Sequence, residues 1–154
     1  MNGDSRAKPE ICNCLALRQA ARHVTQFYDR VLAPAGLRTT QFSILGKLKQ
    51  MGPMTINALA RDLVMDRTTL GRNILPLERE GLIAVAEGRS DRRSKELQVT
   101  DAGAARLRAA AKHWAQAQTR FDAVFGGKRT AELRTILHAV ATSDFGTAGS
   151  GAPE

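Results

Sequence analysis

The chain has 154 residues and carries 23 Lys and Arg against 15 Asp and Glu, a formal net charge of +8 at pH 7. A chain of this length buries more than half of the surface that it exposes when unfolded, so residues 1–154 are expected to form a single domain. No apolar run approaches the roughly 20 residues of a transmembrane helix, and the first residues lack a hydrophobic signal region, which predicts a cytoplasmic protein without a membrane partner. The positive charge favours a polyanionic partner.

The first predicted element is a long amphipathic helix over residues 9–33. Its apolar positions recur at mostly helical spacing, and Pro34 and Gly36 end the pattern. Cys12 and Cys14 stand at i and i+2, about 200° apart on a helix, so they cannot easily bridge each other. We therefore expect two reduced cysteines in a reducing compartment.

Two shorter helices come next. Thr39 or Thr40 is expected to cap the first, which ends at residues 51–53, where Met, Gly and Pro follow one another. The second is predicted over residues 55–63, with Thr55 as its cap. The second of these helices is the first helix of a candidate helix-turn-helix.

A further helix begins at Asp66, whose carboxylate can accept a hydrogen bond from the backbone of Thr69, and stops at Gly81. Its inward face follows the i, i+4, i+7 pattern and consists of Leu70, Ile74 and Leu77. At 100° per residue, Thr68 and Arg72 lie on the opposite side. Arg can bind guanine bidentately in the major groove and Thr can offer a hydroxyl or a methyl group, so these two are the candidate base contacts, flanked by Arg67 and Thr69.

A basic hairpin follows this helix. Two short strands, 82–87 and 95–99, flank a polar loop with four cations and one acid: Arg89, Arg92, Arg93, Lys95 and Asp91. A carboxylate near phosphate repels it, so we expect Asp91 to act internally, by accepting hydrogen bonds from loop amides or by holding an Arg guanidinium. Arg93 is then oriented for the minor groove, whose negative potential attracts it.

Two helices complete the chain, one capped by Thr100 and Asp101 and one over residues 129–143. Together with residues 9–33 they carry more apolar surface than one small winged core can cover. A symmetric homodimer through 9–33 and 101–143 buries these stripes and suits a pseudo-palindromic site on double-stranded DNA. A monomer that folds its long helices back is the alternative.

The predicted fold class is therefore mainly α with a small β-wing. A winged helix-turn-helix DNA-binding region occupies residues 39–100, and N- and C-terminal dimerisation helices occupy 9–33 and 101–143.

Several segments resemble the MarR family of bacterial transcriptional regulators, and together they extend the resemblance over nearly the whole chain: 55–63, 66–70, 77–83, 91–95 and 97–103. The resemblance implies a homodimeric repressor. It places the helix that begins at Asp66 in the major groove, and Asp91 and Arg93 of the wing at the minor groove.

The resemblance also implies an effector, either a small aromatic or phenolic acid or an oxidant. For an anionic aromatic acid, the candidate pocket lies between the first predicted helix (9–33), the second, which ends at 51–53, and the fifth, which begins at Asp101. Arg18, Arg22 and His23 are its candidate cationic partners. A solvated surface is the alternative role of these three residues.

Redox sensing by Cys14 or Cys12 is the second possibility. The organic-hydroperoxide-sensing branch of the family keeps its reactive cysteine near the position of Cys14, and Tyr28 matches one of the two activating tyrosines of that branch. Arg18 stands in place of the other, and a nearby cation favours a thiolate.

Other classes of function have less support. The sequence shows no Ser, His and Asp in the order of a catalytic triad, no glycine-rich phosphate loop and no metal-ligand cluster. We therefore expect that the protein is not an enzyme and has no cofactor and no metal. A winged-helix module that binds protein would present an apolar recognition helix, whereas this one presents Arg67, Thr68 and Arg72.

Overall fold

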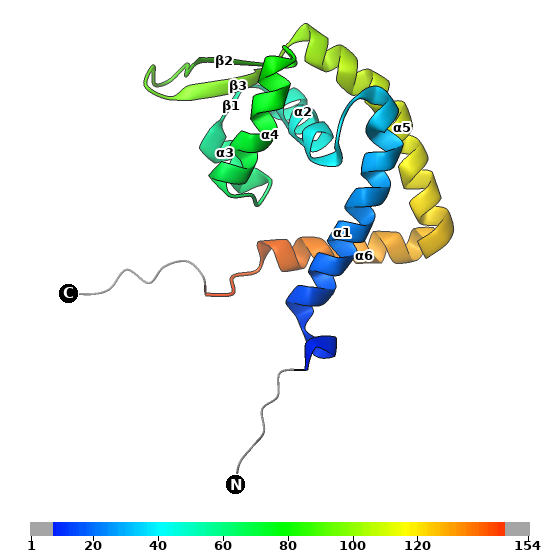
Figure 1. Cartoon of the computed structure of the whole chain (residues 1–154). Coiled ribbons are helices and arrows are strands. Elements are labelled where there is room, and N and C mark those ends of the chain that lie inside the picture. Colours follow the sequence, from blue (N-terminus) through cyan, green and yellow to red (C-terminus); the bar gives the residue numbers. More distant parts are fainter. Residues whose placement is uncertain (1–7, 147–154) are drawn as a thin grey trace, which may run out of the picture. The chain divides into compact units, whose positions relative to one another are not determined.

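The computed structural model describes residues 8–146, which form α-helices, short 3-10 turns and one small antiparallel sheet (Figure 1). The α-helices are α1 (Asn13–Leu32), α2 (Thr39–Met51), α3 (Ile56–Asp62), α4 (Arg67–Arg79), α5 (Asp101–Phe125) and α6 (Gly127–Thr142), with 3-10 turns η1 (Pro9–Ile11) and η2 (Ala33–Ala35). The strands are β1 (Met54–Thr55), β2 (Ile83–Glu87) and β3 (Lys95–Val99). The predicted class, mainly α with a β-wing, is confirmed.

The chain forms two compact units. The first ends at Ala117, within α5, and the second begins at Gln118. No helix in residues 8–146 is both long and apolar enough to cross a bilayer.

The predicted caps of the helix-turn-helix are confirmed. The Thr55 hydroxyl accepts a hydrogen bond from the backbone of Ala58 at 3.1 Å and starts α3. The Asp66 carboxylate accepts one from the backbone of Thr69 at 2.8 Å and starts α4. Each bond satisfies a backbone N–H that the helix itself leaves without a partner, so these short polar side chains set where the two helices begin.

The predicted beginnings of the first two helices are wrong. Residues 9–11 form η1, and α1 begins only at Asn13. Neither Thr39 nor Thr40 caps α2, because Thr39 is its first residue and donates its backbone N–H to the Asp29 carboxylate at 2.7 Å. A side chain of α1 therefore caps α2, which only the packing of the two helices makes possible.

The sheet contains one strand that the sequence did not predict. Its order is β1-β3-β2, and the two residues of β1 pair with β3, Met54 opposite Leu97. On its other side β3 pairs with β2 from Ile83 opposite Val99 to Glu87 opposite Lys95. Strand β3 of the hairpin is thus paired with the segment that leads into α3.

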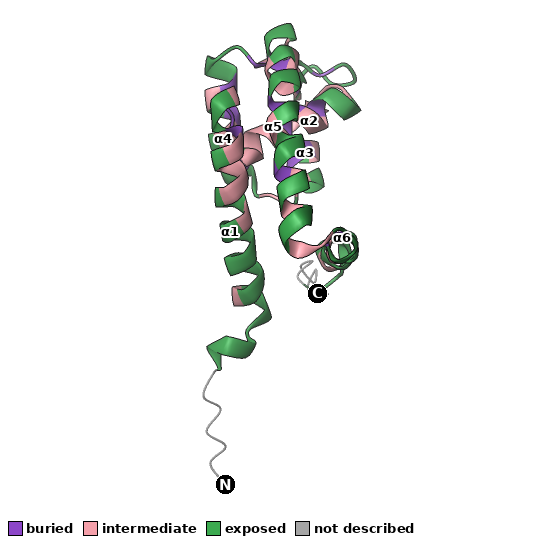
Figure 2. Ribbon diagram, turned by 90° about the vertical axis from the view of Figure 1, so that its right-hand side faces the viewer, coloured by how far each residue is buried: buried purple, intermediate pink, exposed green. Residues whose placement is uncertain are grey.

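The core lies between the sheet and helices α2, α3 and α4. The predicted inward face of α4 is confirmed, since Leu70, Ile74 and Leu77 are all buried. They belong to one apolar cluster with residues from neighbouring elements, among them Leu45, Leu59, Ile83 and Leu97. Figure 2 shows this buried region in purple and shows that the N-terminal half of α1 is exposed.

The second unit contains the end of α5 and α6. Phe121 and Phe125 have ring centroids 5.7 Å apart, and the Arg129 guanidinium lies 4.3 Å from the Phe125 ring centroid. The Thr130 hydroxyl donates to the carbonyl of Gly126 at 2.9 Å. These contacts hold the beginning of α6 on the end of α5.

Candidate nucleic-acid interface

The first turn of α4 is fixed by a double hydrogen bond. Besides its backbone bond, Thr69 donates its hydroxyl to the Asp66 carboxylate at 2.6 Å. This hydroxyl bond, followed by the backbone bond, holds the pKa of the Asp66 carboxyl below its usual value. The Thr69 hydroxyl proton is therefore used within the chain, and the N-terminal end of α4 is held in one geometry.

The outer face of α4 presents the side chains proposed to read bases. Thr68 and Arg72 are exposed, as are Arg67 and Arg79 nearer the two ends of the helix. The chain thus places a hydroxyl and a guanidinium one turn apart on an open surface. Both are groups that can bond to base edges in the major groove.

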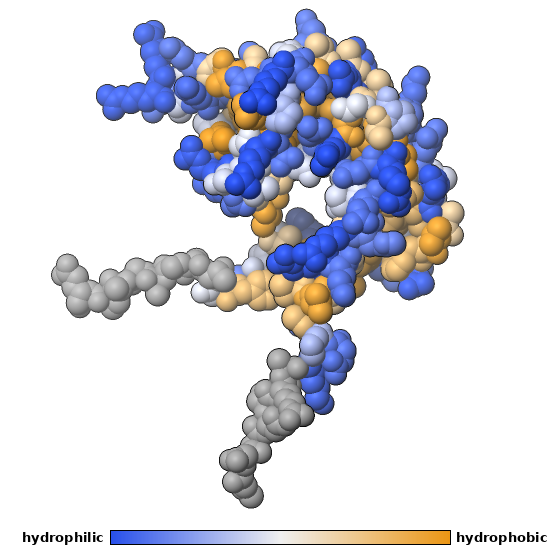
Figure 3. Space-filling view, in the orientation of Figure 1, coloured by the Kyte–Doolittle hydropathy of each residue, from blue (hydrophilic) through white to orange (hydrophobic). Residues whose placement is uncertain are grey.

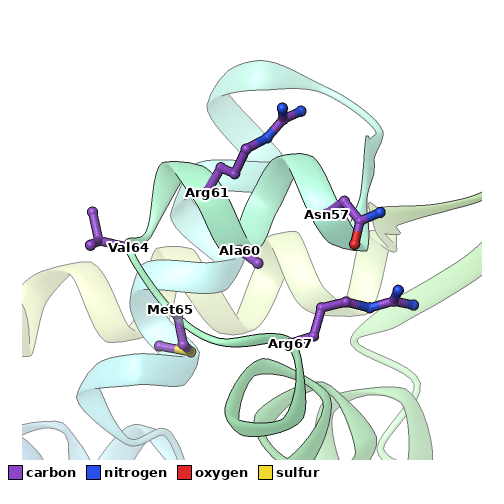
Figure 4. Close-up of a pocket in the computed structure, with 6 residues that line it drawn as sticks. All are labelled: Asn57, Ala60, Arg61, Val64, Met65 and Arg67. Carbon is purple, nitrogen blue, oxygen red and sulfur yellow. The ribbon is translucent and has the colours of Figure 1, made fainter. Parts of the chain in front are cut away.

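A hollow of about 650 Å³ lies between α3 and the beginning of α4 (Figure 4). It is lined by Asn57, Ala60, Arg61, Val64, Met65 and Arg67. Figure 4 shows Asn57 and Arg67 on one side of the hollow, with Arg61 extended away from them. Asn57 and Arg61 were missed by the sequence analysis, although their i, i+4 spacing on α3 marks a polar face. Their amide and guanidinium groups can donate to a DNA phosphate.

The turn beside this hollow has an unusual backbone. Val64 has a φ of 51° and is 73% exposed. A β-branched residue rarely adopts this left-handed conformation, so the turn between α3 and α4 holds an apolar side chain outward at some cost in strain.

The wing is organised around Asp91. Its carboxylate accepts a hydrogen bond from the backbone of Arg93 at 2.9 Å. The carbonyl of Asp91 accepts from the backbone and hydroxyl of Ser94, at 3.1 and 2.8 Å, and the carbonyl of Ser94 accepts from Gly88 at 2.8 Å. Of the two internal roles expected for Asp91, the bond to a loop amide is the one present. It fixes the backbone that carries Arg93.

The cations of the wing are exposed. Arg92, Arg93 and Lys95 are open to solvent, as is Arg89, which has its Nε 4.0 Å from the Glu96 carboxylate. Figure 3 shows the hairpin tip as a hydrophilic projection. An ion pair as long and exposed as this one contributes little, so all four side chains keep their charge available to an anionic partner.

The predicted effector residues lie mainly on the exposed part of α1. Arg18, Arg22 and His23 are exposed and line neither the hollow described above nor a second one of about 540 Å³ at the turn between α1 and α2. Tyr28 is half-buried, edge-on to Phe27 with a centroid distance of 5.3 Å.

The two thiols are also exposed. Cys12 is the N-cap of α1, and its sulfur accepts a hydrogen bond from the backbone of Leu15 at 3.4 Å. Cys14 lies in the first turn of the helix. Within residues 8–146, no group of three or more His, Cys, Asp or Glu side chains is arranged to hold a metal ion.

An aromatic pair that the sequence analysis did not single out joins α2 to α5. The rings of Phe42 and Trp114 are stacked, with centroids 6.1 Å apart and an interplanar angle of 21°. Trp114 remains 39% exposed. It can therefore offer an aromatic edge to a bound molecule.

Known protein families and individual proteins are similar to this chain. The family model described as MarR family matches residues 37–95, from the beginning of α2 to the end of the wing loop. The transcriptional activatory protein BadR of Rhodopseudomonas palustris is 34% identical over 102 residues, which are 63% of this chain and 58% of BadR. The match therefore spans less than two thirds of that relative.

Two similar solved structures contain DNA. The M. tuberculosis transcriptional regulator MosR in complex with DNA is 35% identical with a TM-score of 0.72, and the match covers 84% of this chain and 96% of MosR. The transcriptional repressor CouR bound to a 23-mer DNA duplex is 28% identical with a TM-score of 0.77, and the match covers 89% of this chain and 99% of CouR.

Proposed function

This chain belongs to the MarR family of DNA-binding transcriptional regulators, and on that premise we propose that it is a homodimeric repressor that a small aromatic or phenolic effector releases from a pseudo-palindromic DNA site. The observation that carries the proposal is the combination of a capped α4, with Thr68 and Arg72 exposed, and a wing in which Asp91 fixes the backbone of Arg93. The helix suits the major groove and the wing cation suits the minor groove.

The proposed dimer is supported by apolar side chains that are open to solvent in the single chain. On α6, Ile136 is 61% and Leu137 is 40% exposed, and near the beginning of α1, Ile11 is 72% and Leu17 is 41% exposed. Several large apolar side chains that stay exposed on the helices predicted to dimerise favour an interaction surface on each of these helices. A second copy of the chain is the partner that supplies a matching apolar surface and a two-fold axis.

The proposed effector class is supported by the half-exposed Trp114 stacked on Phe42. An aromatic acid can stack on this pair through its ring. This site joins α2, which precedes the helix-turn-helix, to α5, which follows the wing.

Thiol oxidation is the second candidate signal. Both Cys12 and Cys14 are exposed and lie at the N-terminal end of α1, where an oxidant can reach their sulfur atoms. A module that binds protein instead of DNA has less support, because the exposed face of α4 is polar and cationic near Thr68 and Arg72.

The test is a gel shift with the DNA upstream of the protein's own gene, compared with a duplex of the same composition in scrambled order. We expect specific binding at least about 1,000-fold tighter than scrambled binding, with log K falling linearly as log salt rises. Equal affinity for the two duplexes would refute sequence-specific regulation. Absence of binding at low salt would refute the nucleic-acid partner itself.

A further inference from the structure

One face of α5 lies directly against the segment that ends the proposed recognition helix. The hydroxyl of Thr100, the residue before α5, donates to the carbonyl of Gly81 at 2.6 Å, and its backbone N–H donates to the carbonyl of Leu82 at 3.1 Å. Three residues later, a Cβ on the buried Gly103 would collide with that same Leu82 carbonyl. Only glycine permits so close an approach of helix and turn.

Three residues further, Arg106 continues this face. Its Nη1 lies 3.3 Å from the carboxylate of Glu80, the C-cap residue of α4. The same Nη1 lies 3.5 Å from the carbonyl of Gly36, in the connection between α1 and α2. Gly36 has a φ of 72°, and a Cβ there would stand 2.9 Å from the guanidinium. One side chain therefore contacts the end of α4 and the turn that leads into α2, both from α5.

We propose that Arg106 is a positioning residue, which holds the end of α4 at a set angle to α5 and thereby sets the separation of the two recognition helices on DNA. This proposal rests on the dimeric DNA-binding function proposed above. A guanidinium is planar and binds in a fixed orientation, so it can hold an angle that a flexible ammonium cannot.

The geometry amplifies a small change at Arg106. The 13 residues of α4 make a helix of about 20 Å, with Glu80 just after one end and Thr68, one of the two proposed base contacts, near the other. A rotation of about 10° about the Glu80 end displaces the far end by roughly 3 Å, close to the rise of one base pair in a duplex. Half-site spacing is therefore the property that should depend on this contact.

The experiment compares duplexes that differ only in spacing. The starting duplex is one that the wild-type protein selects from a random library. It is compared with two versions in which one base pair is inserted or deleted at its centre, and with a single half-site. The proteins are wild type, Arg106→Gln, Glu80→Gln and the exchange Arg106→Glu with Glu80→Arg. Arg108→Gln is the control, because it removes the charge of an exposed arginine on the same helix.

We expect wild type to prefer the intact duplex to the altered spacings by about ten-fold or more, the order of one lost contact per site. Arg106→Gln and Glu80→Gln should bind the intact duplex several-fold more weakly and lose most of that preference, while their affinity for the half-site stays within about two-fold. The exchange should restore part of the preference, and Arg108→Gln should behave as wild type.

Unchanged spacing preference in both single variants would overturn the positioning role while leaving DNA binding intact. Equal losses on the half-site and the intact duplex would also overturn it, since they indicate damage to α4 itself. If Arg106→Gln does not fold, Glu80→Gln decides the question, because it removes only the acceptor at an exposed helix end. Failure of wild type to select any DNA would instead overturn the proposed function, and this proposal with it.

Discussion

The Asp91 carboxylate accepts a hydrogen bond at 2.9 Å from the backbone N–H of Arg93, two residues further along the wing. An acidic residue that repels phosphate is thus tied to the cation proposed to enter the minor groove. The bond needs an oxygen acceptor at position 91 and does not need the negative charge.

Substitution of Asp91 separates these two properties. Asp91→Ala removes the acceptor, and we expect DNA affinity to fall by about five-fold, the equivalent of roughly 1 kcal/mol for one lost hydrogen bond. Asp91→Asn keeps an acceptor oxygen and should bind DNA as well as wild type or better. Gel shifts at one salt concentration measure both. Equal loss in the two variants would show that the charge itself matters, for example by holding a guanidinium.

Arg72 and Arg93 are expected to differ in what they contribute. Arg72→Ala should cost about 1 to 3 kcal/mol at one base pair and relax the preference there, because a bidentate contact to a base is lost. Arg93→Ala should weaken binding to all DNA sequences by a similar factor. It should also lower the slope of log K against log salt by about one. Competition with single-base variants of the bound duplex distinguishes them. A uniform loss for Arg72→Ala would make it a phosphate contact.

The first turn of α4 should respond to acid. Because the pKa of Asp66 is lowered from 3.8 in the folded protein, its cap stabilises the fold above that value and is lost as the pH falls through the lower, folded pKa. Thr69→Ala removes the hydroxyl that contributes most, so the pKa of Asp66 should rise toward 3.8. An NMR titration of the Asp66 carboxyl measures this shift. Thr68→Ala, which leaves that hydroxyl in place, should not reproduce it.

The exposed apolar residues of α6 provide a test of the dimer. Ile136→Glu places a charge at a position that is 61% exposed in the single chain and should shift the mass measured by light scattering from dimer to monomer. Ala131→Glu adds the same charge at another exposed position of α6 and should leave the mass unchanged. A dimer in both variants would exclude this surface as the interface.

Trp114 can report effector binding because it is the only tryptophan of the chain. Benzoate and hydroxybenzoates should change its fluorescence and raise the melting temperature, since a ligand that binds the native state stabilises it. Phe42→Ala should weaken the response by removing the stacked partner. A panel of such acids without effect on either signal would count against an aromatic effector at this pair.

The competing signal is tested with the same DNA-binding assay. If Cys14 senses oxidants, one equivalent of an organic hydroperoxide should release the DNA, and Cys14→Ser should remain bound. Cys12→Ser shows whether the helix cap contributes. Unchanged affinity of the wild type after hydroperoxide would remove the redox hypothesis.

The helix-turn-helix and the wing could be predicted because their signals are local. The caps Thr55 and Asp66 each bond to a backbone group three residues away, and the spacing of Leu70 and Ile74 alone predicts which face of α4 is buried. The wing could be located from its charge and flanking strands. The role of Asp91 was left between two alternatives, since a carboxylate beside arginines can accept from amides or from guanidinium groups.

The sequence by itself therefore determined the order of the helices and the wing, the inward face of α4 and the polar residues that are exposed on its outer side. Tertiary structure alone decided that Asp29 caps α2, that β1 joins the sheet and that Arg106 meets both Glu80 and Gly36. The physical reason is distance along the chain. A hydrogen bond within one helical turn follows from residue type and spacing, whereas partners 10, 26 or 70 residues apart meet only after the intervening helices have packed.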